Sequence, residues 1–348
     1  MVSGRDGAQV AVSVIVLAWG SEPYLADCVA SVLADPDDSV ELIVVDNGAE
    51  QAVSGLPSDP RLRVIVTGRN LGFSGGCNEG ARHALGGTLV LLNSDARAEP
   101  GAVAALVSAV RDPAVGMASG SIRLADRPDL MNSAGNPVNF LGVVWAGAFG
   151  EPASLHDAPQ DVPSASGAFL AIRREVWQQL GGFPAEYFAY HEDTELSLRC
   201  WQAGLRVVFE PSAVALHHYA FSRNPRKQYL LQRNRWLTVL TVYPRSVLLA
   251  VLPAMLAFDA ALAGVAAAQG WFPQWLKAWG WLLSHPTLIA RRRRAVLRHS
   301  TISATTFADL LSPVIEPAMI ERPPGTGLLN RLLRCYWGLV RRMLARTV

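Results

Sequence analysis

Several patterns that mark common enzyme classes are scarce or missing in this chain. The 348 residues include four cysteines, which lie far apart and form no Cys-x-x-Cys pair. This argues against a zinc cluster and favours a reducing cytoplasm over an oxidising compartment. The fingerprint Gly-x-Gly-x-x-Gly and the lysine-bearing phosphate loop are both absent, which argues against a dinucleotide-dependent oxidoreductase.

Charge is sparse and unevenly placed. Charged residues make up 17% of the chain, the net charge is +2, and the mean hydropathy of +0.20 is too low for a polytopic membrane protein. Residues 291–348 hold eleven arginines against three acidic residues, a local charge of +8 that leaves −6 for the rest. The basic tail therefore predicts an anionic partner, either a membrane surface or a nucleic acid. The chain carries no RNA- or DNA-binding signature, which favours the membrane.

The first 110 residues alternate apolar stretches with helical patterns. The expected strands are 10–19, 40–46, 61–67 and 88–95, and the expected helices are 24–34, 74–86 and 100–110. Continuous apolar strands separated by helices indicate a parallel sheet covered on both faces. The first run also resembles a weak signal peptide, but its β-branched residues favour a core strand. From residue 111 to 160 the pattern loosens, and two short strands are expected at 206–211 and 213–218.

Two of the expected strands end in an acid, Asp46 and Asp95. Ligands of such sheets bind at the carboxyl ends of the strands, so both acids should face one crevice. Either acid alone could instead cap the helix that follows it. The glycine-rich stretch 70–80 between them favours a nucleotide site, because glycines let backbone N–H groups approach a ligand closely.

A second polar cluster opens the helix expected from residue 192. His191, Glu192, Asp193 and Glu195 lie next to three aromatic residues, and a carboxylate in a partly apolar pocket can act as a general base. Acids at a helix start also favour the helix dipole, so a structural role is the alternative. His217 ends a later strand and could be a metal ligand, although a lone histidine is more often structural.

Seven motifs then occur in a characteristic order. They are VSVIVLAW (12–19), ELIVVDNG (41–48), NLGFSGGCNEG (70–80), LLNSDA (91–96), GAFLAIRREVW (167–177), HEDTELSLRCWQAG (191–204) and PSAVALHH (211–218). This series resembles the inverting family 2 glycosyltransferases, in particular their rhamnosyl- and galactofuranosyltransferase branch. The resemblance implies an α/β fold of the GT-A nucleotide-diphosphosugar type over residues 1–225, followed by a helical, membrane-associating extension.

The resemblance also implies a role for each matching residue. Asp193 would be the catalytic base, Glu192 would position the acceptor, and Asp95 with His217 would hold Mg²⁺ or Mn²⁺ at the donor diphosphate. Asn93 stands where the family's Asp-x-Asp motif more often has a carboxylate, and an amide oxygen is a weaker ligand for a hard cation. The nucleotide-sugar would contact Ala18, Asp46, Arg69, Asn78, Asn93, Ser94 and Asp95. The donor and acceptor pocket would include Gly167, Ala168 and His191.

The substrates expected from the resemblance are a nucleotide-diphosphate sugar and a cell-envelope glycan. dTDP-L-rhamnose is the best guess for the donor, and a lipid-linked or polysaccharide acceptor is expected. A UDP-galactofuranose or UDP-hexose transferase is the alternative within the class. A non-catalytic membrane-associated protein that binds sugar nucleotides or glycans is the alternative from another class, but the combination of Asp95, Asp193 and His217 argues against it.

The chain beyond residue 225 reads as two further segments, 226–300 and 301–348. Residues 247–268 are long enough to span a bilayer, but Pro253 and Asp259 make insertion costly, so interfacial, re-entrant, core and spanning helices all remain open. Residues 328–348 place arginines opposite an apolar face, which suits an anionic leaflet. A docked helix with a solvated basic side is the alternative. The sequence thus predicts an enzyme at the cytoplasmic face of the cell membrane.

Overall fold

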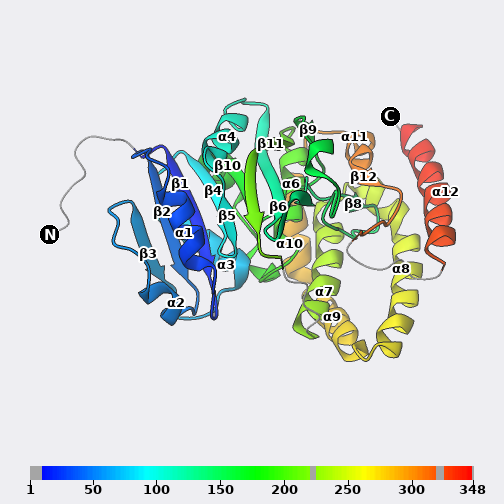
Figure 1. Ribbon diagram of the computed structural model, residues 1–348. Coiled ribbons are helices and arrows are strands. Elements are labelled where there is room, and N and C mark those ends of the chain that lie inside the picture. Colours follow the sequence, from blue (N-terminus) through cyan, green and yellow to red (C-terminus); the bar gives the residue numbers. More distant parts are fainter. Residues whose placement is uncertain (1–9, 220–224, 319–324, 347–348) are drawn as a thin grey trace.

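The computed structural model describes residues 10–219, 225–318 and 325–346. Its centre is a sheet in the order β3-β2-β1-β4-β10-β6-β11-β5 (Figure 1). The first four of these strands run parallel, as expected: β1 (Val12–Ala18), β2 (Val40–Asp46), β3 (Leu62–Val66) and β4 (Thr88–Asn93). Parallel strands end at one edge of a sheet, so this topology brings the carboxyl ends of β1, β2 and β4 together.

Helices cover both faces of the sheet. The first hydrophobic cluster joins one face to α1 (Leu25–Leu33) and α4 (Ala102–Ala109). Another joins the opposite face to α3 (Gly72–His83), α5 (Arg174–Leu180) and α6 (Glu192–Gln202). A short helix, α2 (Glu50–Ser54), lies between β2 and β3. The expected doubly covered α/β sheet is therefore confirmed.

The second half of the sheet departs from the expectation. Residues 111–160 contain the ten-residue strand β6 (Val115–Leu124), which lies between β10 (Phe169–Arg173) and β11 (Arg206–His217). Its core is rich in glycine, alanine and serine, so it lacks the bulky residues that mark a strand in a sequence. A Cβ atom at Gly120 would approach the Phe169 ring to 2.4 Å, so the neighbouring strand fills the space that a side chain would take.

The two strands expected at 206–211 and 213–218 are one strand. β11 runs from Arg206 to His217, and its pairing with β6 shifts between Glu210 and Val214 around Pro211. A bulge accommodates the proline, which has no N–H to give to the ladder. Three smaller strands complete this half: β5 (Ala96–Ala98) pairs with β11, β7 (Arg127–Ser133) with β6 and β9 (Gln160–Asp161) with β11.

Most of the glycine-rich stretch lies in a helix, as expected. α3 begins at Gly72, and a Cβ atom at Gly76 or Gly80 would approach side chains of β1 to 2.2 Å and 2.5 Å. These two glycines therefore let the helix pack closely on the sheet, which corrects their expected role in approaching a ligand.

The C-terminal part is a bundle beside the sheet, with α12 outermost in Figure 1. Its helices are α7 (Pro225–Val242), α8 (Arg245–Ala268), α9 (Phe272–Ser284), α10 (Pro286–Leu297), α11 (Ala304–Asp309) and α12 (Thr326–Ala345). A small sheet of β8 (Val138–Asn139) and β12 (Leu311–Ser312) ties the bundle to the catalytic half. One hydrophobic cluster contains Tyr187 and Leu198 together with residues of α7, α8 and α12, so it crosses both predicted boundaries, at 225 and at 300.

Among the described residues, α8 is the one helix whose length and composition would allow it to cross a membrane. Its acid, Asp259, is buried in the bundle, where it accepts hydrogen bonds from Gln232, Trp236 and Trp279 and pairs with Arg235. The charge of Asp259, which would make membrane insertion costly, therefore has its partners inside the protein.

Candidate functional site

The strand ends gather the first group of predicted residues. Ala18 pairs in register with Asp46, and Leu17 pairs with Asn93, so three strand ends are neighbours. The Asp46 carboxylate accepts hydrogen bonds from the N–H groups of Gly48 and Ala49, at 3.0 and 2.7 Å. The side chain therefore shapes the turn before α2 but does not cap that helix, whose N-cap residue Ala49 has no side-chain cap bond.

Asp95 and His217 meet at the same edge, although 122 residues separate them. Nε2 of His217 lies 3.0 Å from Oδ1 of Asp95, and its Nδ1 lies 2.9 Å from Oδ1 of Asn132. An amide oxygen only accepts, so Nδ1 carries a proton, and Nε2 faces the Asp95 carboxylate, where two acceptors need a proton or a cation between them. This arrangement leaves Nε2 available as a ligand, and the fixed Nδ1 proton is typical of metal-binding histidines.

The donor set fits a divalent cation held partly by substrate. No group of three or more histidine, cysteine or acidic side chains suited to a metal occurs within the described ranges. Asp95 and His217 supply a carboxylate oxygen and an imidazole nitrogen, and Asn93 lies beside them, with Nδ2 3.5 Å from Nε2 of His217. Two protein ligands leave coordination positions for phosphate oxygens and water, as metals in nucleotide-dependent sites require.

Glu22 is a second carboxylate near this pair. Its Oε1 accepts from the N–H of Trp19 at 3.1 Å, and its backbone has a positive φ of 37°. Burial raises the pKa of Glu22, the charge of Asp95 adds to this, and hydrogen bonds from Ser94 and Trp19 oppose it. Ser94 therefore contacts Glu22 in the loop after β1.

Residues 167 and 168 connect the pair of Asp95 and His217, called the cation pair below, to the predicted base, Asp193. The N–H of Gly167 donates to Oδ2 of Asp193 at 2.9 Å, and the carbonyl of Ala168 accepts from the N–H of Asn93, also at 2.9 Å. Oδ1 of Asp193 accepts from the N–H of Thr194 at 2.7 Å. Burial raises the pKa of Asp193, whereas these hydrogen bonds lower it, and the net shift is upward. A buried carboxylate with a raised pKa is a stronger base once it is ionised.

Glu192 and His191 are buried with atoms that have no partner. Oε2 of Glu192 and Nδ1 of His191 make no hydrogen bond, and both side chains are at least nine-tenths buried. Burial, aided by the charge of Asp193, raises the pKa of Glu192 well above its ordinary range, and burial lowers the pKa of His191 to about 3. His191 is thus neutral, and both buried atoms keep unused hydrogen-bonding capacity.

Of the other predicted nucleotide contacts, Arg69 lies in a loop and Asn78 in a helix. Arg69 is exposed in the connection between β3 and α3. Asn78 lies within α3, where its amide donates to the carbonyl of Phe183 at 2.8 Å and accepts from the N–H of Phe183 at 3.0 Å. The structure thus shows Asn78 holding the chain that leads towards α6, and its role as a nucleotide contact stays a prediction.

The sequence patterns did not point to Glu22, Asn132 or Asn234. Glu22 and Asn132 lie in segments without a motif, and only their folded positions bring them to the cation pair. Asn234 lies in the Arg-Asn-Arg run of α7, 41 residues after the predicted base, and contacts the loop before α6.

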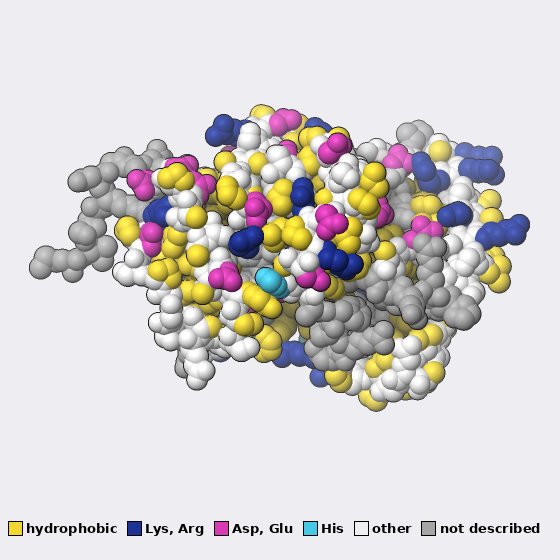
Figure 2. Space-filling view, in the orientation of Figure 1, with side chains coloured by type: hydrophobic (Ala, Val, Ile, Leu, Met, Phe, Trp, Pro, Cys, Tyr) yellow, Lys and Arg dark blue, Asp and Glu magenta, His cyan; other side chains and the backbone are white. Residues whose placement is uncertain are grey.

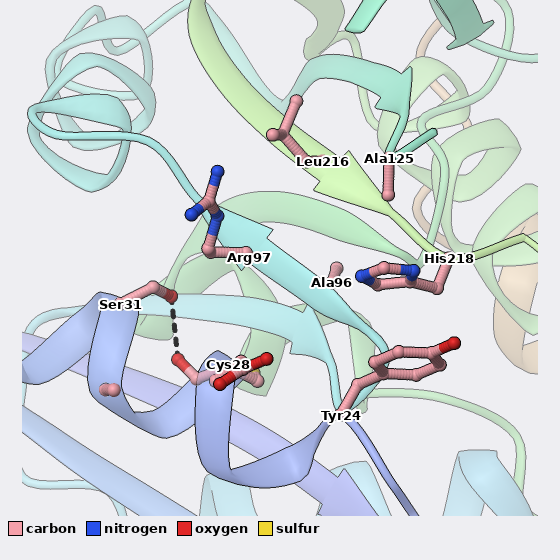
Figure 3. Close-up of a pocket in the computed structure, with 10 residues that line it drawn as sticks. Tyr24, Cys28, Ser31, Ala96, Arg97, Ala125, Leu216 and His218 are labelled. Atoms are coloured by element: carbon pink, nitrogen blue, oxygen red, sulfur yellow. Dashed lines mark hydrogen bonds between the residues drawn. The ribbon is translucent and has the colours of Figure 1, made fainter. Parts of the chain in front are cut away.

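A cavity of about 500 Å³ adjoins the cation pair on the side of α1 and β5 (Figure 3). The Tyr24 and His218 rings stack on each other in its lining, with their centroids 3.7 Å apart. The N–H of His218 donates to the carbonyl of Asp95. Arg97 also lines the cavity, and Ser31 donates to the carbonyl of Cys28 at 2.7 Å. The stack therefore joins the start of α1 to the end of β11 beside His217.

Comparison with known proteins places this geometry in a family. The model described as "Glycosyltransferase like family 2" matches residues 8–238. An N-acetylglucosaminyl-diphospho-decaprenol L-rhamnosyltransferase of Mycobacterium tuberculosis is 28% identical over 237 residues, which cover 60% of this chain and 76% of that protein.

Two solved structures share the fold at low sequence identity. Staphylococcus aureus TarS in complex with UDP-GlcNAc is 14% identical, with a TM-score of 0.53 over 97% of this chain and 92% of TarS. The mannosyltransferase PcManGT of Pyrobaculum calidifontis, in complex with GDP-Man and Mn²⁺, is 19% identical, with a TM-score of 0.50 over 83% of this chain and 85% of that protein. These likenesses establish the GT-A fold.

Proposed function

Because the chain belongs to glycosyltransferase family 2 and is a glycosyltransferase, we propose that it is an inverting, metal-dependent enzyme that transfers L-rhamnose from dTDP-L-rhamnose to a lipid-linked glycan acceptor. The observation that carries this proposal is the pair of Asp95 and Nε2 of His217, 3.0 Å apart at the strand-end edge. The same edge carries Asp193 through its bond to Gly167.

The residues divide the chemistry between them. Asp95 and His217 would hold a divalent cation, which would stabilise the negative charge that the leaving diphosphate gains. Asp193 would take the proton of the acceptor hydroxyl as that oxygen attacks the anomeric carbon. Glu192, whose free Oε2 is buried beside Asp193, would orient the hydroxyl. One displacement from the face opposite to the diphosphate inverts the anomeric centre.

The donor and acceptor are inferred from the relatives. The similar mycobacterial protein is named for rhamnosyl transfer to a diphospho-decaprenol-linked sugar, which supports dTDP-L-rhamnose and a lipid-linked acceptor. UDP-GlcNAc in TarS supports the alternative of a UDP-sugar donor on this fold. A non-catalytic binding protein would need no base, so the buried, hydrogen-bonded Asp193 favours the enzyme.

A thermal-shift panel tests the donor. The full chain is heated with dTDP-L-rhamnose, UDP-galactofuranose, UDP-hexoses or GDP-mannose, each with Mn²⁺, Mg²⁺ or EDTA. The largest cation-dependent rise in Tm is expected with dTDP-L-rhamnose, because a ligand that binds only the folded state stabilises it.

Transfer to a polyprenyl-diphosphate N-acetylglucosamine acceptor then tests catalysis. Asp193→Asn should lower turnover by about 10²–10⁴-fold while it keeps the thermal shift with the donor. A larger response to a UDP-sugar would replace rhamnose as the donor. No response to any nucleotide sugar would support the binding-protein alternative.

We also place the enzyme at the cytoplasmic face of the membrane, with α8 and α12 as the contact surface. The exposed large apolar residues of these helices are Leu249, Leu256, Val265, Leu328, Leu332, Leu339 and Met343. Exposed arginines of α12, among them Arg331, Arg334 and Arg342, flank this surface. Figure 2 shows basic and hydrophobic side chains together at the end of the molecule where α12 lies. An apolar stripe with arginines matches an anionic leaflet.

A further inference from the structure

The loop that leads into α6 is held in an unfavourable backbone conformation. Phe188, Tyr190 and His191 have φ values of 64°, 70° and 70°, and they are three of the five non-glycine residues with positive φ among those described. A positive φ is unfavourable for a residue with a side chain, so surrounding contacts must hold the loop in place. Glu192 and Asp193 follow directly, so the path of this loop fixes where both carboxylates point.

Helix α7 supplies those contacts through the side chains of two consecutive residues, Arg233 and Asn234. Nδ2 of Asn234 lies 3.0 Å from the carbonyl oxygen of Tyr187, 2.9 Å from that of Ala189 and 2.8 Å from that of Tyr190. The two amide hydrogens are therefore shared among three carbonyls of the loop. Asn234 is fully buried, and water does not compete for these bonds.

Arg233 sets the orientation of the Asn234 amide. Its Nε donates to Oδ1 of Asn234 at 2.9 Å, which turns the Nδ2 end towards the loop. A terminal nitrogen of Arg233 donates to the carbonyls of Glu186 and Tyr187, at 2.7 and 2.9 Å. Two consecutive residues of α7 thus bond the main chain of the loop from residue 186 to residue 190.

The same turn of α7 is anchored on its other side. Arg235 pairs with Asp259 of α8, and Trp236 donates to the same carboxylate at 3.0 Å. The residues that hold the loop therefore stand on a helix that is fixed by a buried ion pair. Asn234 is fully buried and its amide bonds the loop main chain, so we expect its effect on catalysis to act through the loop.

We propose that Asn234, oriented by Arg233, is a positioning residue that holds the 186–191 main chain so that Glu192 and Asp193 face the acceptor. The assignment rests on the proposed function, because it takes Asp193 as the base. Loss of the amide lets the loop relax towards ordinary φ values, and the carboxylates then leave their reactive positions.

The test compares Asn234→Ala with Asn330→Ala in the full chain. Asn330 of α12 is a matched control, because its buried amide likewise bonds a main chain, that of Ile315, at 2.9 and 3.1 Å. Both variants should lower Tm by similar amounts. Asn234→Ala should lower kcat about 100-fold with donor KM within about threefold of the wild type, whereas Asn330→Ala should leave kcat unchanged.

Hydrogen exchange provides a readout that needs no activity. Peptides covering 186–195 should exchange about tenfold faster in Asn234→Ala than in the wild type or in Asn330→Ala. If Asn234→Ala does not fold, Asn234→Ser retains one donor and should give intermediate values of kcat and exchange.

The proposal is overturned if kcat of the Asn234 variant matches that of Asn330→Ala, or if exchange at 186–195 is unchanged. Failure of the proposed function looks different. The wild type then transfers no sugar from any donor, and the exchange measurement alone decides the role of Asn234.

Discussion

The imidazole of His217 is fixed by a hydrogen bond to Asn132. Oδ1 of Asn132 accepts from the Nδ1–H group at 2.9 Å, and Nε2 faces the Asp95 carboxylate at 3.0 Å. Without this bond the ring could adopt the other tautomer, with a proton on Nε2 in place of the ligand lone pair. We therefore expect Asn132 to support the proposed cation site through its hydrogen bond to His217.

Asn132→Leu tests this contribution. Cation-dependent donor affinity should fall by about 10–100-fold, and stability should fall by about 1–3 kcal/mol, because the buried Nδ1–H group of His217 loses its acceptor. Titration calorimetry of the donor with Mn²⁺ and with EDTA measures the affinity, and Asp95→Ala gives the full loss of the cation site. Donor affinity equal to that of the wild type would show that Asn132 does not orient the ring.

The proposed role of Asp193 as the base predicts the acid side of the pH–rate profile. Because burial raises this pKa, the ionised base is lost as pH falls through a value above the usual 3.8 for aspartate. Thr194→Val removes a hydroxyl 3.3 Å from Oδ1, which stabilises the ionised form, so the acid limb of kcat/KM should move to higher pH. Thr194→Ser keeps the hydroxyl and should leave the limb in place. A shift to lower pH in Thr194→Val would contradict the assignment of the limb to Asp193.

At the scale of elements, α8 combines an exposed apolar face with one buried charge. Leu249 and Leu256 are exposed on one side of the helix and Val265 on another, near its end, while Asp259 is buried in the bundle and pairs with Arg235. Burial lowers the pKa of Arg235 and the Asp259 charge raises it, so each charge is tolerated there because of the other. The pair joins α8 to α7, and through α7 to the loop before α6.

Asp259→Leu should therefore destabilise the protein by about 3–5 kcal/mol, because it leaves the Arg235 guanidinium buried without its counter-charge. The double variant Asp259→Leu/Arg235→Met should recover most of this loss, since two apolar groups can replace a buried ion pair. Urea denaturation of the single and double variants measures both values. A double variant no more stable than the single one would show that the hydrogen bonds of Asp259, rather than the paired charges, hold the helices.

Helix α12 divides its apolar residues between two surfaces. Leu333, Trp337, Val340 and Leu344 are buried in the bundle, with the Trp337 ring stacked 4.8 Å from that of Phe140. Leu332, Leu339 and Met343 are exposed beside the arginines. The structure therefore shows the docked side of this segment, and contact between its exposed apolar side and a membrane stays a prediction.

At the scale of the whole molecule, one hydrophobic cluster links the loop before α6 to α12, which carries part of the proposed membrane surface. The cluster that contains Trp337 also contains Tyr187, which lies in the loop before α6. Deletion of residues 328–348 would open that cluster, so point substitutions on the exposed side are the cleaner test of membrane binding.

Leu332→Glu/Leu339→Glu should abolish sedimentation with vesicles that contain anionic lipid, because it removes exposed apolar area and adds negative charge near the leaflet. Leu155→Glu is the matched control, since Leu155 is 68% exposed on the catalytic half. Binding of the wild type should weaken as salt is raised. Undiminished sedimentation of the double variant would remove α12 from the contact surface.

The sequence by itself determined the parallel half of the sheet and the motifs at its edge. Apolar β-branched strands and intervening helices are local patterns, and parallel strands must end together, so Asp46 and Asp95 could be placed at one edge. The family resemblance added His217 and Asp193, whose meeting with this edge no local pattern predicts.

Only the tertiary structure decided what depends on distant packing. β6 was missed because its small residues are buried against large neighbours, and the α3 glycines serve close packing on β1. Asn132 and Asn234 reach the site across 85 and 44 residues, from His217 and Tyr190. Periodicity reports which face of an element is buried, whereas the partner of a buried polar group depends on where the rest of the chain returns.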